Sequence, residues 1–175
     1  MAILGREEVI STVMEQTMGF EYVDLKDVDP NFTLLDGPEV YSLRITKAEM
    51  PTYIAKKTTK NQTAGDEVKY IKFTFTVVDH PKFTGRKHWE PLFGASDFNL
   101  KNLKRIEEAT GVEQTGSMVD WLGQLTRIHP VIKLQIHKVP DVNFDGSINP
   151  NNLKSDGVTP KDKNVVNWKA GVQAA

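Results

Sequence analysis

The sequence of 175 residues predicts a mainly β domain in which five strands form a Greek-key barrel, decorated by a helix between the third and fourth strands. Apolar and polar residues alternate with a period of two over 40–46, 71–77 and 131–138, as in half-buried strands. Helical spacing replaces this alternation after residue 96. With 39% hydrophobic and 26% charged residues, the composition is that of a globular protein that buries a core.

Residues 1–39 are predicted to be an acidic leader ahead of the barrel. Four apolar residues near its start can share one face of a short helix that ends near Gly19: Val9, Ile10, Val13 and Met14. After residue 20, the sequences Asp-Pro-Asn and Asp-Gly-Pro are typical of turns, which favours an irregular chain before the first strand.

Residues 40–140 are predicted to form the barrel itself. The first strand begins at Val40, and a polar, turn-rich loop over 56–66 separates it from the second strand. The second strand has the clearest alternation, with inward Ile71, Phe73, Phe75 and Val77 opposite Tyr70, Lys72, Thr74 and Thr76. The third strand, 86–93, has less regular faces, because Lys87 and Trp89 share a side with Pro91 and Phe93.

Helical signals follow the third strand. Ser96 or Asp97 can cap a helix that Gly111 ends, and Ser117 begins another short turn or helix that buries Trp121 or Leu122. A strand over 131–138 comes next, and 141–175 is predicted to be a polar loop with a short final strand that packs on the core.

The order strand, strand, strand, helix, strand is that of the oligonucleotide-binding (OB) fold. That fold binds ligands on the face of its second and third strands and with the adjoining loops. An immunoglobulin-like sandwich, which would need more strands and no central helix, and a generic α+β domain are the alternatives.

Composition and charge narrow the class of protein further. The chain has no cysteine, which excludes thiol nucleophiles, cysteine zinc sites and disulfides, and which suits a reducing compartment. It has no leader-like basic start and no apolar run of about 18 residues, so we expect a cytoplasmic protein without a membrane partner. Residues 1–43 have a net charge of −7 and residues 44–90 a net charge of +5, which predicts a basic surface on the central segment or, alternatively, two solvated faces of opposite charge.

Binding of a single strand without regard to sequence requires cations along the phosphates and flat side chains on which bases stack. The central segment offers both on the outward faces of its strands and in its mobile loop. The candidate nucleic-acid-binding residues are Arg44, Tyr53, Lys56, Lys57, Lys60, Tyr70, Lys72, Arg86, Lys87 and Trp89. For the three aromatic residues the alternative is a role in packing, and for the lysines a role as ordinary solvated charges. His88 is predicted to be a surface residue without a role.

The segment 141–152 begins like a calcium loop, with oxygen-bearing side chains at alternate positions around Gly146. Its twelfth position is Asn152, which cannot supply the bidentate carboxylate that completes a calcium site, so a polar Asx-type turn is favoured. We expect no metal and no cofactor. The sequence also contains none of the common nucleotide-binding, zinc-protease or hydrolase motifs, so no enzymatic activity is expected.

Several short segments carry a family resemblance: 23–25, 34–37, 41–45, 75–78, 83–87, 103–106, 109–112 and 121–123. They resemble phage-encoded single-stranded DNA-binding proteins, over about residues 20–140 and 165–169. The resemblance implies an OB-fold protein that binds and protects single-stranded DNA in viral replication or recombination, in the host cytoplasm, with phage replication or recombination proteins as further partners. The sequence ends without the acidic tail by which such proteins commonly recruit partners.

Two other classes of protein remain as alternatives. The first is a structural or adaptor domain of a phage virion that binds protein, and the second is an accessory subunit or an unrecognised nuclease. Whether the protein is a monomer or a dimer is open at this stage.

Overall fold

The computed structural model describes residues 34–143 and 145–175. All of these residues belong to the second of the two units into which the chain divides, residues 33–175. The short helix expected before Gly19 and most of the acidic leader lie outside the described residues. None of the described helices is long and apolar enough to cross a membrane.

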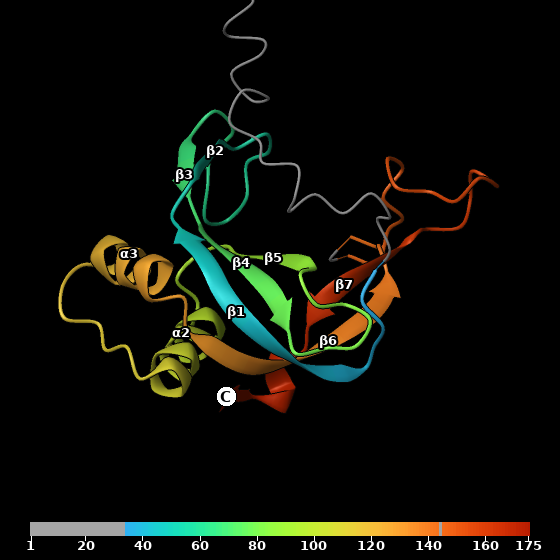
Figure 1. The fold of residues 1–175 in the computed structure, drawn as a ribbon. Coiled ribbons are helices and arrows are strands. Elements are labelled where there is room, and N and C mark those ends of the chain that lie inside the picture. Colours follow the sequence, from blue (N-terminus) through green and yellow to red (C-terminus); the bar gives the residue numbers. More distant parts are fainter. Residues whose placement is uncertain (1–33, 144) are drawn as a thin grey trace, which may run out of the picture. The chain divides into compact units, whose positions relative to one another are not determined.

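Six strands form one antiparallel sheet in the order β5-β4-β1-β6-β7, with β8 paired to a further part of β6 (Figure 1). The strands are β1 (Glu39–Glu49), β4 (Ile71–Val78), β5 (Lys87–Leu92), β6 (Val131–Pro140), β7 (Asp162–Val166) and β8 (Val172–Ala174). The prediction of a mainly β domain is confirmed, and three strands of this sheet precede the helical segment while three follow it.

Two short strands, β2 (Thr52–Ile54) and β3 (Glu67–Lys69), pair with each other between β1 and β4 in the chain. We call residues 52–69 the hairpin. The polar segment predicted as a loop forms its connection, and the hairpin stands above the ends of β1 and β4 in Figure 1. Ala55 N donates to Asp66 O at 2.9 Å, which holds the base of this connection together.

Two helices follow β5, namely α2 (Asp97–Thr110) and α3 (Met118–Ile128), and they lie on one side of the sheet (Figure 1). The Ser96 side chain caps α2, and Gly111 ends it in the left-handed conformation with φ of 69°. Ser117 and Asp120 form a capping box at the start of α3. The expectation of one helix between the third and fourth main strands is therefore corrected to two, because the second cap starts a full helix.

The core lies between the sheet and these helices. Phe73, Phe75 and Val77 on β4 are fully buried, as their alternation predicts. Both Trp121 and Leu122 of α3 are buried, and the Trp121 indole donates a hydrogen bond to Val112 O at 2.7 Å, so its polar atom is satisfied inside the core.

A closed barrel is not formed by hydrogen bonds within the described residues, because β5 and β7 end the sheet without a ladder between them. Pro91 on β5 has no N–H to donate to a further strand, which disfavours pairing at that edge. The one short final strand predicted within 141–175 is corrected to two, β7 and β8, which are separated by a short 3₁₀ helix, η2 (Trp168–Ala170).

Candidate nucleic-acid interface

The outward face of β5 exposes one residue in two. Lys87, Trp89 and Pro91 are exposed, whereas His88 and Leu92, on the other face of the strand, are buried. Trp89 is 48% exposed although tryptophan is usually well buried, and the other two tryptophans, Trp121 and Trp168, are buried. About half of Trp89 is therefore accessible to solvent.

Neighbouring strands add cations to the same face. Thr76 on β4 lies opposite Arg44 of β1 on one side and Lys87 of β5 on the other. Adjacent strands are about 4.8 Å apart, so Arg44 and Lys87 stand about 10 Å apart with a short threonine between them. Both cationic residues are exposed. We call the outward side of β1, β4 and β5 the sheet face.

A β-bulge in β1 shapes the next row of the sheet face. The register shifts between Ile45 and Lys47, so that Thr74 on β4 faces Lys47 on one side and Trp89 on the other. The Thr46 hydroxyl lies 3.1 Å from Thr74 O and 3.2 Å from the Thr76 hydroxyl, and these hydrogen bonds fix the bulge. The exposed Trp89 and the cations are thus mounted on a rigid three-stranded surface.

The third row contains Lys72, which lies opposite Glu49 of β1 and Pro91 of β5. Lys72 is half-buried, and the Glu49 carboxylate pairs with Lys47 at 2.8 Å. This part of the sheet face is therefore less positive than the row that contains Arg44 and Lys87.

Three aromatic rings meet where the hairpin joins the sheet, and we call them the aromatic cluster. Tyr53 comes from β2, Tyr70 links β3 to β4, and Phe93 follows β5. The Tyr70 and Phe93 rings stack with centroids 4.9 Å apart, and the Tyr53 ring meets each of them edge-on at 5.7 Å. The three residues line a hollow of about 340 Å³.

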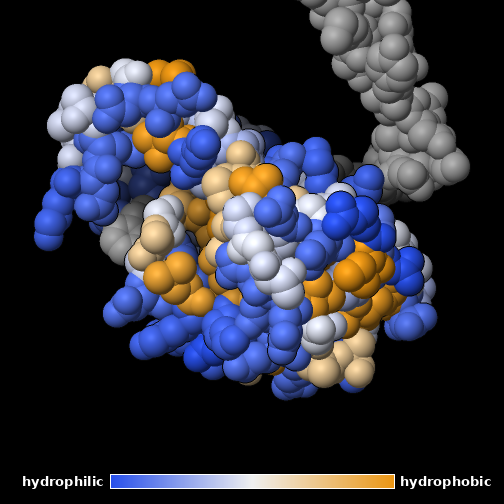
Figure 2. All heavy atoms as spheres, turned by 90° about the vertical axis from the view of Figure 1, so that its left-hand side faces the viewer, coloured by the Kyte–Doolittle hydropathy of each residue, from blue (hydrophilic) through white to orange (hydrophobic). Residues whose placement is uncertain are grey.

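The lysines of the hairpin stand beside this cluster. Lys56 and Lys57 line a second hollow, of about 590 Å³, together with Tyr53. Lys60 is exposed further along the connection. The Tyr53 hydroxyl donates to Gln62 Oε1 at 2.8 Å, which ties the connection back onto β2. Figure 2 shows the hairpin side of the molecule, where a hydrophilic hairpin overhangs a hollow with hydrophobic residues along its rim.

The structure thus brings the predicted residues into two groups. Arg44, Lys72, Lys87 and Trp89 share the sheet face, whereas Tyr53, Tyr70, Lys56 and Lys57 gather at the aromatic cluster and the hollow beside it. Lys60 belongs to neither group. Arg86 is half-buried and precedes β5, so it is less accessible to a phosphate than Lys87 is.

Sequence reasoning missed two features here. His88 is not a surface residue: it is 7% exposed, its ring stacks on Phe75, and its Nε2 lies 2.8 Å from Glu90 Oε2. Phe93 is 56% exposed and completes the aromatic cluster, but it was not among the candidates. The signal for Phe93 was present, because it continues the alternation of Lys87, Trp89 and Pro91.

The segment that begins like a calcium loop satisfies its own polar groups. The Asp141 carboxylate accepts from Asn152 Nδ2 at 2.7 Å and pairs with Lys163 Nζ at 2.9 Å. These two contacts hold the pKa of Asp141 below its usual value. Ser147 N donates to Asp145 Oδ1 at 2.9 Å, which is the hydrogen bond of an Asx-type turn. In the part of the chain that the structure describes, no group of three potential metal ligands lies together.

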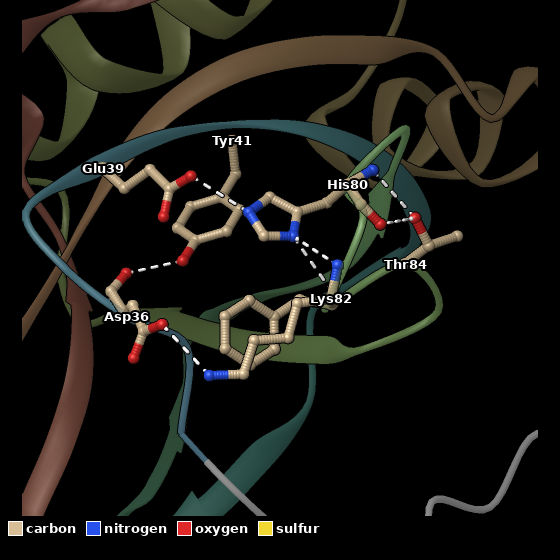
Figure 3. A network of polar contacts seen from close by, with 7 residues as sticks. Asp36, Glu39, Tyr41, His80, Lys82 and Thr84 are labelled. Carbon is tan, nitrogen blue, oxygen red and sulfur yellow. Dashed lines mark hydrogen bonds and ion pairs between the residues drawn. The ribbon is translucent and has the colours of Figure 1, made fainter.

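A further polar network joins the start of β1 to the turn between β4 and β5 (Figure 3). His80 Nδ1 accepts from the backbone N–H groups of Lys82 and Phe83, both at 3.1 Å, so its Nε2 carries the proton and donates to Glu39 Oε1 at 3.0 Å. The buried Tyr41 hydroxyl donates to Asp36 O at 2.6 Å. Each ring nitrogen of His80 has a hydrogen-bond partner, and the network holds the turn before Arg86 against the start of β1.

Comparison of the chain with models of protein families, with curated proteins and with solved structures found no match. The function therefore has to be argued from the sheet face, the hairpin and the aromatic cluster themselves.

Proposed function

We propose that this protein is a non-enzymatic single-stranded DNA-binding protein that holds and protects single strands without regard to sequence, in phage DNA replication or recombination. The observation that carries the proposal is the sheet face. There an exposed tryptophan lies one row away from two exposed cations, Arg44 and Lys87, on hydrogen-bonded strands. The phage setting rests on the sequence resemblance alone.

The strand order supports a partly open OB fold. If β1, β4, β5, β6 and β7 are taken as its five strands, the sheet order is third, second, first, fourth, fifth, which is the order of a Greek-key barrel cut between the third and fifth strands. In that fold the ligand lies on the second and third strands and the loops after the first and fourth. The second and third strands would be β4 and β5, and the hairpin would be the loop after the first.

The chemistry of the sheet face fits a strand of any sequence. Stacking on an aromatic ring is worth about 1–3 kcal/mol per base and is available to every base. Arginine and lysine neutralise phosphates that are the same in every nucleotide. The hairpin borders the same region and carries Lys56, Lys57 and Lys60. These lysines would add positive charge along the phosphate backbone of a bound strand.

Tryptophan fluorescence tests the proposal directly, because Trp89 is the exposed tryptophan and Trp121 and Trp168 are buried. We expect titration with oligo-dT to quench the fluorescence, and duplex DNA to compete poorly. With about five phosphates neutralised and a slope near −0.7 per phosphate, affinity should fall about a hundredfold between 50 and 200 mM salt.

The matched variants are Trp89→Phe and Trp89→Ala. Phenylalanine keeps a ring for stacking, so it should abolish the quenching while it keeps most of the affinity, as judged by the anisotropy of a labelled oligonucleotide. Alanine should weaken binding to all sequences alike, by about 5- to 150-fold. If the wild-type protein shows no binding even at 50 mM salt, the proposal is wrong, and a protein-binding adaptor domain becomes the better hypothesis.

A further inference from the structure

We propose that the aromatic cluster is a second base-binding subsite, which takes one unstacked base of the same strand that lies on Trp89. This inference rests on the proposed function. It adds that the single strand is held at two separate aromatic points, on the sheet face and under the hairpin, so that the protein requires a minimum length of strand.

The aromatic cluster has the shape and exposure that a base needs. Phe93 is 56% exposed, and the Tyr70 ring stacks on it at 4.9 Å, so Phe93 offers exposed ring surface that is already held in place by a partner. Tyr53 meets the pair edge-on and gives the hollow a wall. The hollow of about 340 Å³ is open to solvent, so a flat base can enter it from the surface.

The surroundings favour a nucleotide over an apolar peptide. Lys56 and Lys57 line the adjoining hollow next to Tyr53, and Lys69 lines another that shares Tyr70 with the cluster. A base in the cluster would therefore have Lys56 and Lys57 of the adjoining hollow beside its phosphates. The subsite is also continuous with the sheet face, because Phe93 follows Trp89 and Pro91 at every second position.

The spacing of the two subsites sets the length of strand. Trp89 and Phe93 are four residues apart, which is about 13 Å along an extended chain. At the 3.4 Å rise of stacked bases, about four base steps cover this distance, and a more extended strand needs fewer. A strand of about three to five nucleotides is thus the shortest that reaches both subsites, and shorter strands reach only one.

The test compares affinities of labelled oligo-dT of 2 to 12 nucleotides for the wild-type protein, Phe93→Ala and Trp89→Ala, by fluorescence anisotropy. Phe98→Ala is the matched control, because Phe98 on α2 is 51% exposed and lies outside both subsites. We expect Phe93→Ala to weaken binding of the 12-mer by about 5- to 150-fold and of the 2-mer by less than about threefold. Phe98→Ala should bind every length like the wild type.

A merely structural role of Phe93 would lower the affinity for all lengths by the same factor, and that result would overturn the second subsite. Phe93→Leu, which keeps apolar bulk but has no ring, guards against loss of folding and should show the same dependence on length. If Phe93→Ala binds every length like the wild type while Trp89→Ala is weakened, the second subsite is wrong and the proposed function stands. If the wild-type protein binds no oligonucleotide, both are wrong.

Discussion

The row of Arg44, Thr76 and Lys87 allows a quantitative prediction about salt. Replacement of both cations by glutamine in one double variant keeps side chains of similar length but removes two charges that stand about 10 Å apart on rigid strands. Each phosphate contact contributes about 0.7 to the slope of log affinity against log salt for a single strand. Arg44→Gln with Lys87→Gln should therefore reduce the slope by about 1.4.

The expected magnitudes follow from a wild-type protein that neutralises about five phosphates. Its affinity should fall about a hundredfold from 50 to 200 mM salt, whereas that of the double variant should fall only about twentyfold. Anisotropy of a labelled oligo-dT at four salt concentrations measures both slopes and does not depend on Trp89 fluorescence. Lys169→Gln is the control, because Lys169 is exposed in η2, outside the sheet face, and should keep the wild-type slope.

Two outcomes would refute the reasoning on this row. If the double variant has both the wild-type slope and the wild-type affinity, Arg44 and Lys87 do not contact phosphates. If it has the wild-type slope but a lower affinity at every salt concentration, the loss comes from altered structure and not from counterion release. Melting temperatures of the variants distinguish a refuted contact from an unfolded protein.

The remaining predictions concern stability. Gly37→Ala should lower the unfolding free energy by about 2 kcal/mol in a urea titration, because an added Cβ would lie 2.4 Å from the backbone oxygen of Ile136 on β6. Gly123→Ala should instead raise the unfolding free energy by about 0.5–1 kcal/mol, because its Cβ would enter open space on α3. Equal effects of the two variants would contradict this account. Burial raises the pKa of the Tyr41 hydroxyl, so the folded state holds its proton more tightly than the unfolded state does. The contribution of this proton to stability is complete below about pH 10 and is lost as the pH rises further. The unfolding free energy measured from pH 8 to 11 should therefore fall less steeply for Tyr41→Phe than for the wild type. Parallel curves for the two proteins would contradict this.

The parts of the fold that were predictable are those in which local pattern and burial agree. The alternation of β4 placed Phe73, Phe75 and Val77 in the core because a strand that is buried on one face tolerates no shift of register. Helix caps at Ser96 and Ser117 were visible because their side chains satisfy backbone donors of the first turn.

The parts that were not predictable depend on contacts between side chains that the alternation of a single segment does not show. His88 is polar yet buried, and only its pairing with Glu90 and its stacking on Phe75 explain how the inner side of β5 accepts it. The aromatic cluster likewise needs Tyr53 of β2, Tyr70 between β3 and β4, and Phe93 after β5. The pattern of apolar residues within one segment does not predict that these three parts of the chain meet.

The sheet face shows why a prediction of the core also locates the surface that we propose for binding. Once the buried face of β4 is fixed, Thr74 and Thr76 must lie on its other face, where the registers of β1 and β5 bring long side chains to both sides of them. These side chains leave Thr76 half-buried and Thr74 only 9% exposed. Threonine side chains are short, so the surface along β4 is lower than the long side chains that flank it. Cations of β1 stand on one side of it, and Lys87 and Trp89 stand on the other. A chain that lies along β4 could therefore touch cations on both flanks while its bases reach Trp89. Replacing Thr76 by a bulky tryptophan should obstruct this path and weaken single-strand binding although every proposed contact residue is still present.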